Sequence, residues 1–166
     1  MPRSIVSVLL ENEPGALSRV VGLFSQRGYN IESLTVAPTD DATLSRLNIT
    51  SHVVDDASRE QIEKQLHKLV DILKVSNVSS ADHIERELML LKVKISGSGR
   101  DEVKRMSDIF RGQVVDVTAN LFTVQLVGNS AKLDGFLTAM ADVAEIIEVA
   151  RSGVVGIARG DRVLRP

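Results

Sequence analysis

The stretch Asn12-Glu13-Pro14-Gly15-Ala16-Leu17-Ser18 joins a predicted strand to a predicted helix. The strand is the apolar run over residues 5–10, and the helix covers residues 16–27, where apolar side chains recur at helical spacing. The first N–H groups of a helix have no partner inside the helix, and the helix dipole gives them partial positive charge. A glycine at this point lets another molecule approach the backbone closely. The sequence therefore predicts a small carboxylate site at Gly15, Ala16 and Leu17.

The elements that follow this turn complete the pattern of a small domain. Strands are expected over residues 5–10, 31–37, 44–50 and 70–78, and helices over residues 16–27 and around Ile62, Leu66 and Leu69. Residues 38–41 are turn material, and Asp55-Asp56 supplies a helix N-cap. The order strand, helix, strand, strand, helix, strand predicts a ferredoxin-like plan, with the helices on one face of an antiparallel sheet.

The second half of the chain repeats this topology without repeating the sequence. Strands are expected over residues 84–95, 114–117, 121–127 and 146–150, and helices over residues 100–111 and 132–141. The polar, turn-rich residues 77–83 mark the boundary between the halves. We therefore predict an α+β protein with two ferredoxin-like βαββαβ domains in tandem, over residues 1–78 and 79–166.

Composition excludes several classes of function. The chain has 166 residues, 43% of them hydrophobic and 25% charged, which is an ordinary soluble balance. The net charge of −2 and the aromatic share of 3% argue against a nucleic-acid-binding protein. The absence of cysteine removes disulfides, thiolate metal sites and cysteine nucleophiles. No run approaches the roughly 18 apolar residues that span a membrane. No secretory signal is evident at the start, so a cytoplasmic location is expected.

The histidines and paired aspartates of the sequence do not indicate a metal site or a catalytic site. His52, His67 and His83 lack partners at ligand spacing, so no metal site is expected. The pairs Asp40-Asp41 and Asp55-Asp56 lack the apolar flanks that raise a carboxyl pKa for acid catalysis, and they suit a turn and an N-cap. No nucleophile elbow or triad is apparent, so no catalytic residue is predicted.

Two further stretches contain glycines or arginines that could suit an anion or a partner. Residues 97–101, Gly-Ser-Gly-Arg-Asp, lack the lysine and the glycine spacing of a P-loop, and a flexible turn explains them well. Four arginines near the C-terminus indicate a partner-facing or solvated end, and they are Arg151, Arg159, Arg162 and Arg165.

The opening turn remains the best candidate for a functional site. A plain helix start with Asn12 in an Asx turn explains it about as well as a ligand site does. Asn30 and Ile31, at the start of the next strand, are expected on a neighbouring strand or across a dimer interface. Side-chain amides accept hydrogen bonds from an ammonium group and donate to a carboxylate, and a zwitterionic amino acid needs both functions. Apolar side chains available for its pocket are Leu9, Leu17, Ile31 and Val36.

Longer stretches carry a resemblance to a known family. Residues 7–20 (SVLLENEPGALSRV) and 23–36 (LFSQRGYNIESLTV) resemble the regulatory small subunit of acetolactate (acetohydroxyacid) synthase, most closely the bacterial type III-like short form. Residues 111–117 (RGQVVDV) and 148–160 (EVARSGVVGIARG) support it, and the resemblance covers essentially the full length. The N-terminal strand, turn and helix alone would indicate only an ACT domain, a module that senses amino acids.

The resemblance implies a regulatory, non-catalytic subunit. Its first domain is expected to be an ACT domain that forms a homodimer and activates the catalytic large subunit. The expected effector is a branched-chain amino acid, with valine as the one predicted. Thiamine diphosphate, FAD and Mg²⁺ are expected in that large subunit, with no cofactor in this chain. The implied effector site combines Asn12, Gly15, Ala16 and Leu17 of one subunit with Asn30 and Ile31 of the other. Ser18 and Ala37 match family positions whose substitution relieves feedback.

Two other classes of function remain as alternatives. One is a stand-alone ACT regulator that binds an amino acid and has no enzyme partner. The other is a small ferredoxin-like enzyme that uses the Gly97 turn or the paired aspartates. The lack of any convergent His, Cys or Lys constellation counts against the enzyme.

Overall fold

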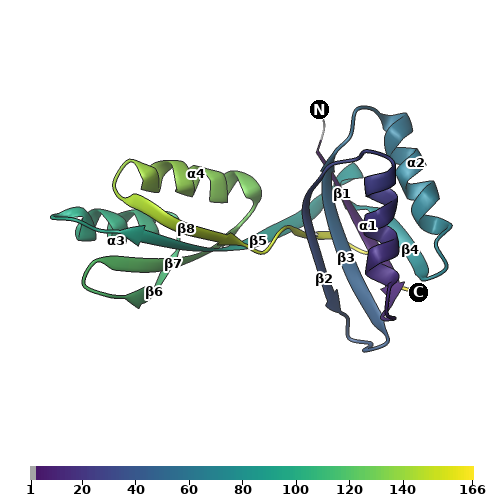
Figure 1. Ribbon diagram of the computed structural model, residues 1–166, viewed down its shortest axis with the longest axis horizontal. Coiled ribbons are helices and arrows are strands. Elements are labelled where there is room, and N and C mark those ends of the chain that lie inside the picture. The colour runs from purple at the N-terminus through teal and green to yellow at the C-terminus, as the bar shows by residue number, and fades with distance from the viewer. Residues whose placement is uncertain (1–2) are drawn as a thin grey trace. The chain divides into compact units, whose positions relative to one another are not determined.

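The computed structural model describes residues 3–166, which form two compact units (Figure 1). The first unit comprises the chain up to Ile84 together with Val154–Pro166, and the second is Glu85–Gly153. Both units carry helices on one face of an antiparallel sheet, so the predicted α+β class with two βαββαβ repeats is confirmed. The functional division at residues 78 and 79 stays a prediction.

The first unit contains the predicted βαββαβ order. Its elements are β1 (Arg3–Glu11), α1 (Ala16–Gln26), β2 (Ile31–Pro38), β3 (Leu44–His52), α2 (Asp56–His67) and β4 (Ile72–Asn77), followed by the short 3-10 helix η1 (Val78–Ser80). The strand order is β2-β3-β1-β4, and every neighbouring pair is antiparallel. The strands β2 and β4 are therefore the two edges of this sheet.

The core of the first unit lies between the sheet and its two helices. Alternate residues of β1, Val6, Val8 and Leu10, are almost fully buried in one cluster with Val20 of α1 and Leu66 of α2. Burying each such side chain contributes about 1.5–3 kcal/mol. Since this alternation assigns one face of β1 to the helices, the intervening residues of the strand face the other side of the sheet.

Local hydrogen bonds confirm the predicted roles of the paired aspartates. The Asp55 side chain caps α2 by accepting a hydrogen bond from the backbone N–H of Ser58 at 2.7 Å, and bonds from Ser58 hold the pKa of Asp55 below its ordinary value. The carboxylate of Asp41 accepts bonds from the hydroxyl and backbone N–H of Thr43, which lower the pKa of Asp41. Both pairs therefore stabilise a local turn or a helix start.

The second unit repeats the arrangement. Its elements are β5 (His83–Lys94), α3 (Gly99–Ile109), β6 (Gln113–Val117), β7 (Leu121–Gly128), α4 (Ser130–Ala141) and β8 (Glu145–Arg151), with the strand order β6-β7-β5-β8. Its core includes the fully buried Met89, Leu91, Val124, Leu133 and Phe136. The side chain of Asn129 caps α4 by accepting from the backbone N–H of Lys132 at 2.9 Å.

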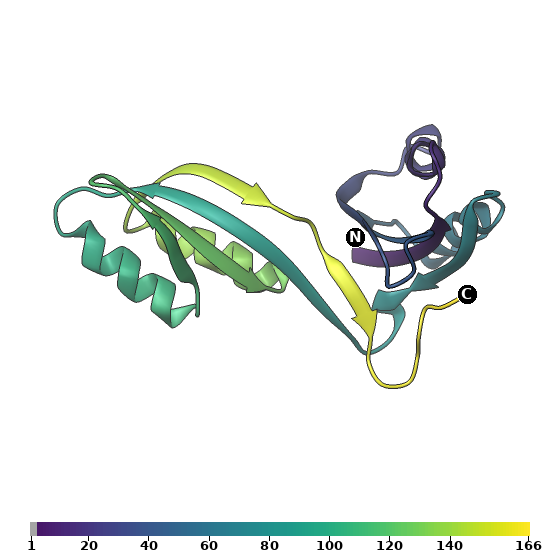
Figure 2. The same ribbon diagram turned by 90° about the horizontal axis from the view of Figure 1, so that it is seen from below.

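The C-terminal segment, residues 154–166, belongs to the first unit, which the sequence pattern did not predict. Figure 2 shows in yellow its strand β9 (Val155–Ala158), which pairs with β5. The guanidinium of Arg46 donates to the carbonyl of Gly156 at 2.8 Å, and Val154 is buried in a small cluster with Ile5 and Val78. The start of this segment therefore packs against β1.

The arginines near the C-terminus are mostly engaged within the units. Arg159 forms an ion pair with Asp82 at 3.2 Å, and Arg165 forms one with Asp40 at 3.2 Å. In the second unit, Arg151 bridges Glu87 and Asp134, at 2.5 and 2.8 Å. Three of the four predicted partner-facing arginines thus have intramolecular partners.

Candidate functional site

The turn between β1 and α1 presents free backbone donors. Gly15 is the N-cap residue of α1 and has φ of +85°, a left-handed conformation that favours glycine. The N–H of Ala16 donates to the carbonyl of Glu13 at 3.2 Å, whereas the N–H groups of Leu17 and Ser18 have no acceptor within residues 3–166. The predicted carboxylate site thus has free donors, although Ala16 is not one of them.

Asn12 is held by the hairpin between β2 and β3. Its backbone N–H donates to the carbonyl of Thr43 at 2.8 Å, and its side-chain amide donates to the carbonyl of Ala42 at 3.2 Å. Asn12 forms no Asx turn, because such a turn needs the N–H of the residue two positions on, which is Pro14 and has none. The oxygen of its amide group has no donor among the described residues and is available to an ammonium group.

Arg19 adds a cation beside Gly15, one helical turn further along α1. Its Nε donates to the carboxylate of Asp71 at 2.5 Å, and the Asp71 side chain is only 8% exposed. This hydrogen bond to the Asp71 carboxylate raises the pKa of Arg19. A Cβ placed on Gly15 would lie 3.2 Å from Nη1 of Arg19. The sequence pattern did not predict the pair of Arg19 and Asp71. The four-residue spacing of Gly15 and Arg19 was the one local signal for Arg19, and nothing local indicates its contact with Asp71.

Asn30 and Ile31 lie at the opposite end of the same sheet. Ile31 pairs with Ser51 of β3, and Ser51 in turn pairs with Ser4 near the start of β1. Glu11, at the end of β1, pairs with Leu44 at the other end of β3. The seven steps from Leu44 to Ser51 correspond to about 23 Å along β3 at the usual rise of a strand. One chain therefore does not bring its two groups of predicted site residues together.

Two partly exposed apolar side chains lie on the helix-covered side of the first unit. Leu17 is 38% exposed and Val36 is 42% exposed, and Val36 pairs with the buried Leu47 of the core. The prediction that Leu9 contributes to the same pocket is wrong. Leu9 pairs with Arg46 and points to the other face of the sheet, because it alternates with the core residues of β1.

The two positions predicted to affect feedback lie at the Gly15 end of the first unit. Ser18 is exposed in the first turn of α1. Ala37 is exposed on the edge strand β2 and pairs with Arg46, on the face of the sheet away from the helices. Within residues 3–166, neither Ser18 nor Ala37 forms a hydrogen bond with Gly15.

The other candidate stretches have structural roles. Residues 97–99 form the turn into α3, where Arg100 stacks over the Phe122 ring at 5.2 Å and donates to the carbonyl of Ala119. Among residues 3–166, no three His, Cys, Asp or Glu side chains are grouped so as to hold a metal ion. No helix in this range is long and apolar enough to cross a membrane.

Two family models match the sequence, one over each half. A model described as an AHAS small subunit-like ACT domain matches residues 6–74, and one described as the small subunit of acetolactate synthase matches residues 86–160. The acetolactate synthase isozyme 3 small subunit of Escherichia coli (strain K12) is 68% identical over 163 residues, covering 98% of this chain and 99% of that protein. The chain belongs to the acetolactate synthase small-subunit family.

Other members of the acetolactate synthase small-subunit family support the assignment. The small subunit of Haemophilus influenzae is 60% identical over 160 residues, covering 96% of this chain and 98% of that protein. The crystal structure of the Thermotoga maritima small subunit matches with a TM-score of 0.89 and 34% identity, covering 98% and 100% of the two chains. The first domain is thus an ACT domain, as predicted. Because these relatives are named as subunits of an enzyme, the family favours a subunit over a stand-alone regulator.

Proposed function

We propose that this small subunit binds the catalytic subunit of acetolactate synthase, raises its activity and makes it sensitive to inhibition by valine. The chain itself performs no catalysis in this scheme. Thiamine diphosphate, FAD and Mg²⁺ belong to the catalytic subunit, and the complex works in the cytoplasm. Membership of the small-subunit family supports the partnership.

The main support for the effector site is where the two groups of predicted site residues lie, one around Gly15 and the other at Asn30 and Ile31. Gly15 and Asn30 lie at opposite ends of one sheet, so a single chain offers only half of a site at each end. The edge strand β2 provides a way to join them, because its outer backbone groups have no strand partner within residues 3–166. Two β2 strands paired antiparallel would place the Asn30 end of one chain beside the Gly15 end of the other. The effector site is then formed twice in each homodimer.

The chemistry of the turn suits an amino acid with a short apolar side chain. The free N–H groups of Leu17 and Ser18 donate hydrogen bonds to the carboxylate, and the helix dipole favours its negative charge. The side-chain oxygens of Asn12 and of the partner subunit's Asn30 accept from the ammonium group. The half-exposed Leu17 and Val36 supply the apolar contact.

Feedback then follows from a difference in affinity between two states. Valine shifts the complex only if it binds one arrangement of the ACT dimer better than the other. A coupling free energy of about 1–3 kcal/mol gives a 5- to 150-fold effect on affinity.

The test is reconstitution with the purified catalytic subunit. The rate of acetolactate formation is measured with increasing amounts of the small subunit, with and without valine. We expect stimulation by the small subunit and loss of that stimulation with valine. A catalytic subunit whose rate is unchanged by the added chain would contradict the proposal.

A further inference from the structure

The side chain of Arg19 lies beside the free backbone donors at the start of α1. Long side chains of a helix lean toward its N-terminus, which brings this guanidinium back to Gly15. Nη1 of Arg19 lies 3.2 Å, and Nη2 lies 3.7 Å, from the place that a Cβ would take on Gly15. The N–H groups of Leu17 and Ser18, which have no acceptor within residues 3–166, belong to the same turn. The guanidinium and the free N–H groups therefore adjoin the same glycine.

The chain uses only part of this guanidinium. Nε donates to the carboxylate of Asp71, whereas Nη1 and Nη2 have no hydrogen-bond acceptor among the described residues. The Arg19 side chain is 45% exposed, so its remaining N–H groups are accessible. A guanidinium presents its N–H groups in pairs that match the two oxygens of a carboxylate. Arg19 can therefore hold Asp71 on one side and bind a second carboxylate on another.

Asp71 fixes the position of the guanidinium. Its side chain is nearly buried, and its backbone carbonyl accepts from the N–H of Glu11 at 2.9 Å, which ties the residue to the end of β1. A carboxylate at such a place needs its cationic partner, because an unpaired buried charge is strongly unfavourable. The ion pair thus holds the guanidinium in one place before a ligand arrives. A group that is already ordered loses less conformational entropy when it binds.

Acidic side chains in the turn make a cation necessary for an anionic ligand. Glu11 and Glu13 are exposed and lie just before Gly15 in the chain. Their negative charges oppose the partial positive charge at the start of the helix, so the backbone donors alone make a weak anion site. Arg19 supplies a full positive charge at this point. Binding of a carboxylate at the turn therefore depends on Arg19.

We propose that Arg19 binds the carboxylate of the amino-acid effector through Nη1 and Nη2, beside the N–H groups of Leu17 and Ser18. Asp71 is then a positioning residue, which orients the guanidinium and does not touch the ligand. The inference rests on the proposed function, because the effector and its place at this turn come from there. It adds a side chain that selects for a free carboxylate.

Three variants of the full chain distinguish a ligand contact from a structural ion pair, and calorimetric titration with valine measures each of them. Arg19→Gln removes the cation but leaves Asp71 unpaired. Asp71→Asn removes the ion pair but keeps the guanidinium. The double variant Arg19→Gln/Asp71→Asn removes the cation without leaving a buried charge unpaired, and thermal unfolding verifies that it is folded. We expect both variants that lack Arg19 to bind valine at least about tenfold more weakly than the wild type, and Asp71→Asn to lose less.

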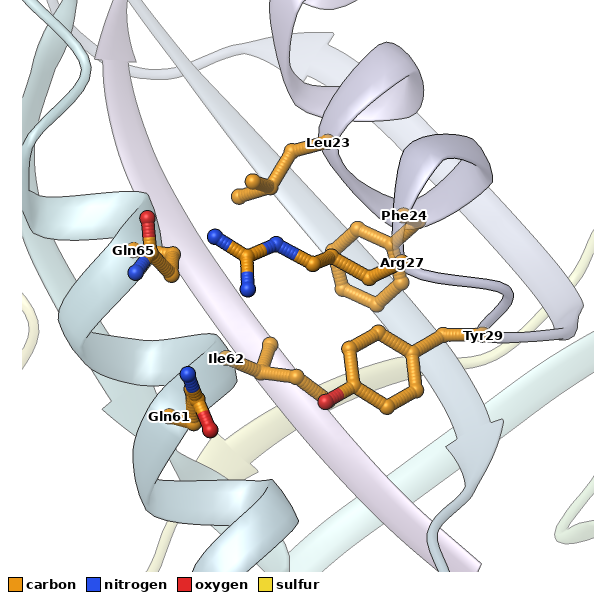
Figure 3. Close-up of a pocket in the computed structure, with 7 residues that line it drawn as sticks. All are labelled: Leu23, Phe24, Arg27, Tyr29, Gln61, Ile62 and Gln65. Carbon is orange, nitrogen blue, oxygen red and sulfur yellow. The ribbon is translucent and has the colours of Figure 1, made fainter.

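Arg27→Gln is the matched control, because it makes the same charge change on the same helix. Arg27 follows the last turn of α1, about 12 Å from Arg19 along the helix axis, and its guanidinium extends toward α2 (Figure 3). Its valine affinity should stay within about twofold of the wild type, since an exposed charge at that distance is screened. A loss as large as that of Arg19→Gln would mean that only the overall charge matters, and the inference would be wrong.

The outcomes distinguish this inference from the proposed function. If the double variant binds valine as tightly as the wild type, or if Asp71→Asn loses as much affinity as the double variant, Arg19 is no ligand contact. The proposed function stands in that case, provided that the wild type activates the catalytic subunit and responds to valine. A wild type that binds valine without activating contradicts the proposed function, and the variants still decide the role of Arg19. A wild type that binds no valine contradicts both.

Discussion

Nη1 of Arg19 lies 3.2 Å from the place that a Cβ would take on Gly15, while Nε of the same side chain is held by the buried carboxylate of Asp71. Two independent reasons therefore keep position 15 a glycine. The left-handed backbone disfavours any side chain, and the guanidinium of Arg19 crowds the position that a Cβ would take.

Gly15→Asp should abolish the response to valine. The new carboxylate lies at the start of α1, where it competes with the ligand carboxylate for the free N–H groups and for Arg19. Isothermal titration of valine measures the effect. Gly15→Ala is the uncharged control: it suffers the backbone strain, about 1–2 kcal/mol, without the competing charge, so it weakens binding less. Wild-type affinity in Gly15→Asp would refute the assignment of this turn.

Mixed dimers should recover half of the effector sites. If each site combines Gly15 of one chain with Asn30 of the other, a dimer of Gly15→Asp and Asn30→Ala chains has one doubly altered site and one intact site. Differently tagged chains are co-purified, and the valine stoichiometry is measured by titration. We expect half of the wild-type stoichiometry in the mixed dimer and none in either parent homodimer. A mixed dimer that binds no valine would show that both residues act within one chain.

The cap of α2 should make stability depend on pH. The pKa of Asp55 is lowered in the folded state, so its stabilising effect is present above the unfolded pKa and is lost as pH falls through the folded pKa. Chemical unfolding is measured between neutral and acidic pH. Asp55→Asn keeps a capping oxygen without titrating, so the difference between wild type and variant should shrink or change sign as the pH falls. A difference that is constant with pH would contradict this role.

Deleting residues 154–166 should destabilise the first unit and leave the second unaffected. The deletion exposes Ile5 and Val78 and removes the buried Val154, at a cost of about 1.5–3 kcal/mol for each fully buried side chain. Hydrogen exchange should quicken in β1 and η1. Deletion of residues 161–166 is the matched control, because it removes only the exposed ion pair of Arg165 with Asp40. Unchanged exchange in the longer deletion would show that the segment does not stabilise this unit.

The sequence predicted the elements whose pattern is local. The apolar periodicity of α1, the hairpin turn at Asp41 and the cap at Asp55 all depend on residues a few positions apart, and each was confirmed. The role of Leu9 was misread for a physical reason. Because β1 is buried on both faces, its residues form a continuous apolar run that hides the alternation.

Contacts between residues far apart in the chain leave no local pattern in the sequence from which they could be predicted. The Arg19 and Asp71 pair joins residues 52 positions apart, and Arg46 meets Gly156 across 110 positions. The strand β9 is short and mostly exposed, with a glycine at its second position, so neither length nor periodicity marks it as a strand. Pairing with β5 and the tertiary contacts of Val154 define this segment.

The position of β9 bears on how the protein is made. Ile5 of β1 packs with Val154, which is translated after the whole of the second unit, Glu85–Gly153. The first unit therefore cannot complete its packing until Val154 has been synthesised, although the second unit is available to fold earlier. Contacts between residues far apart in a chain also slow folding, since a long loop must close before they form. During synthesis the first unit is thus the later of the two to be completed, although it begins first in the sequence.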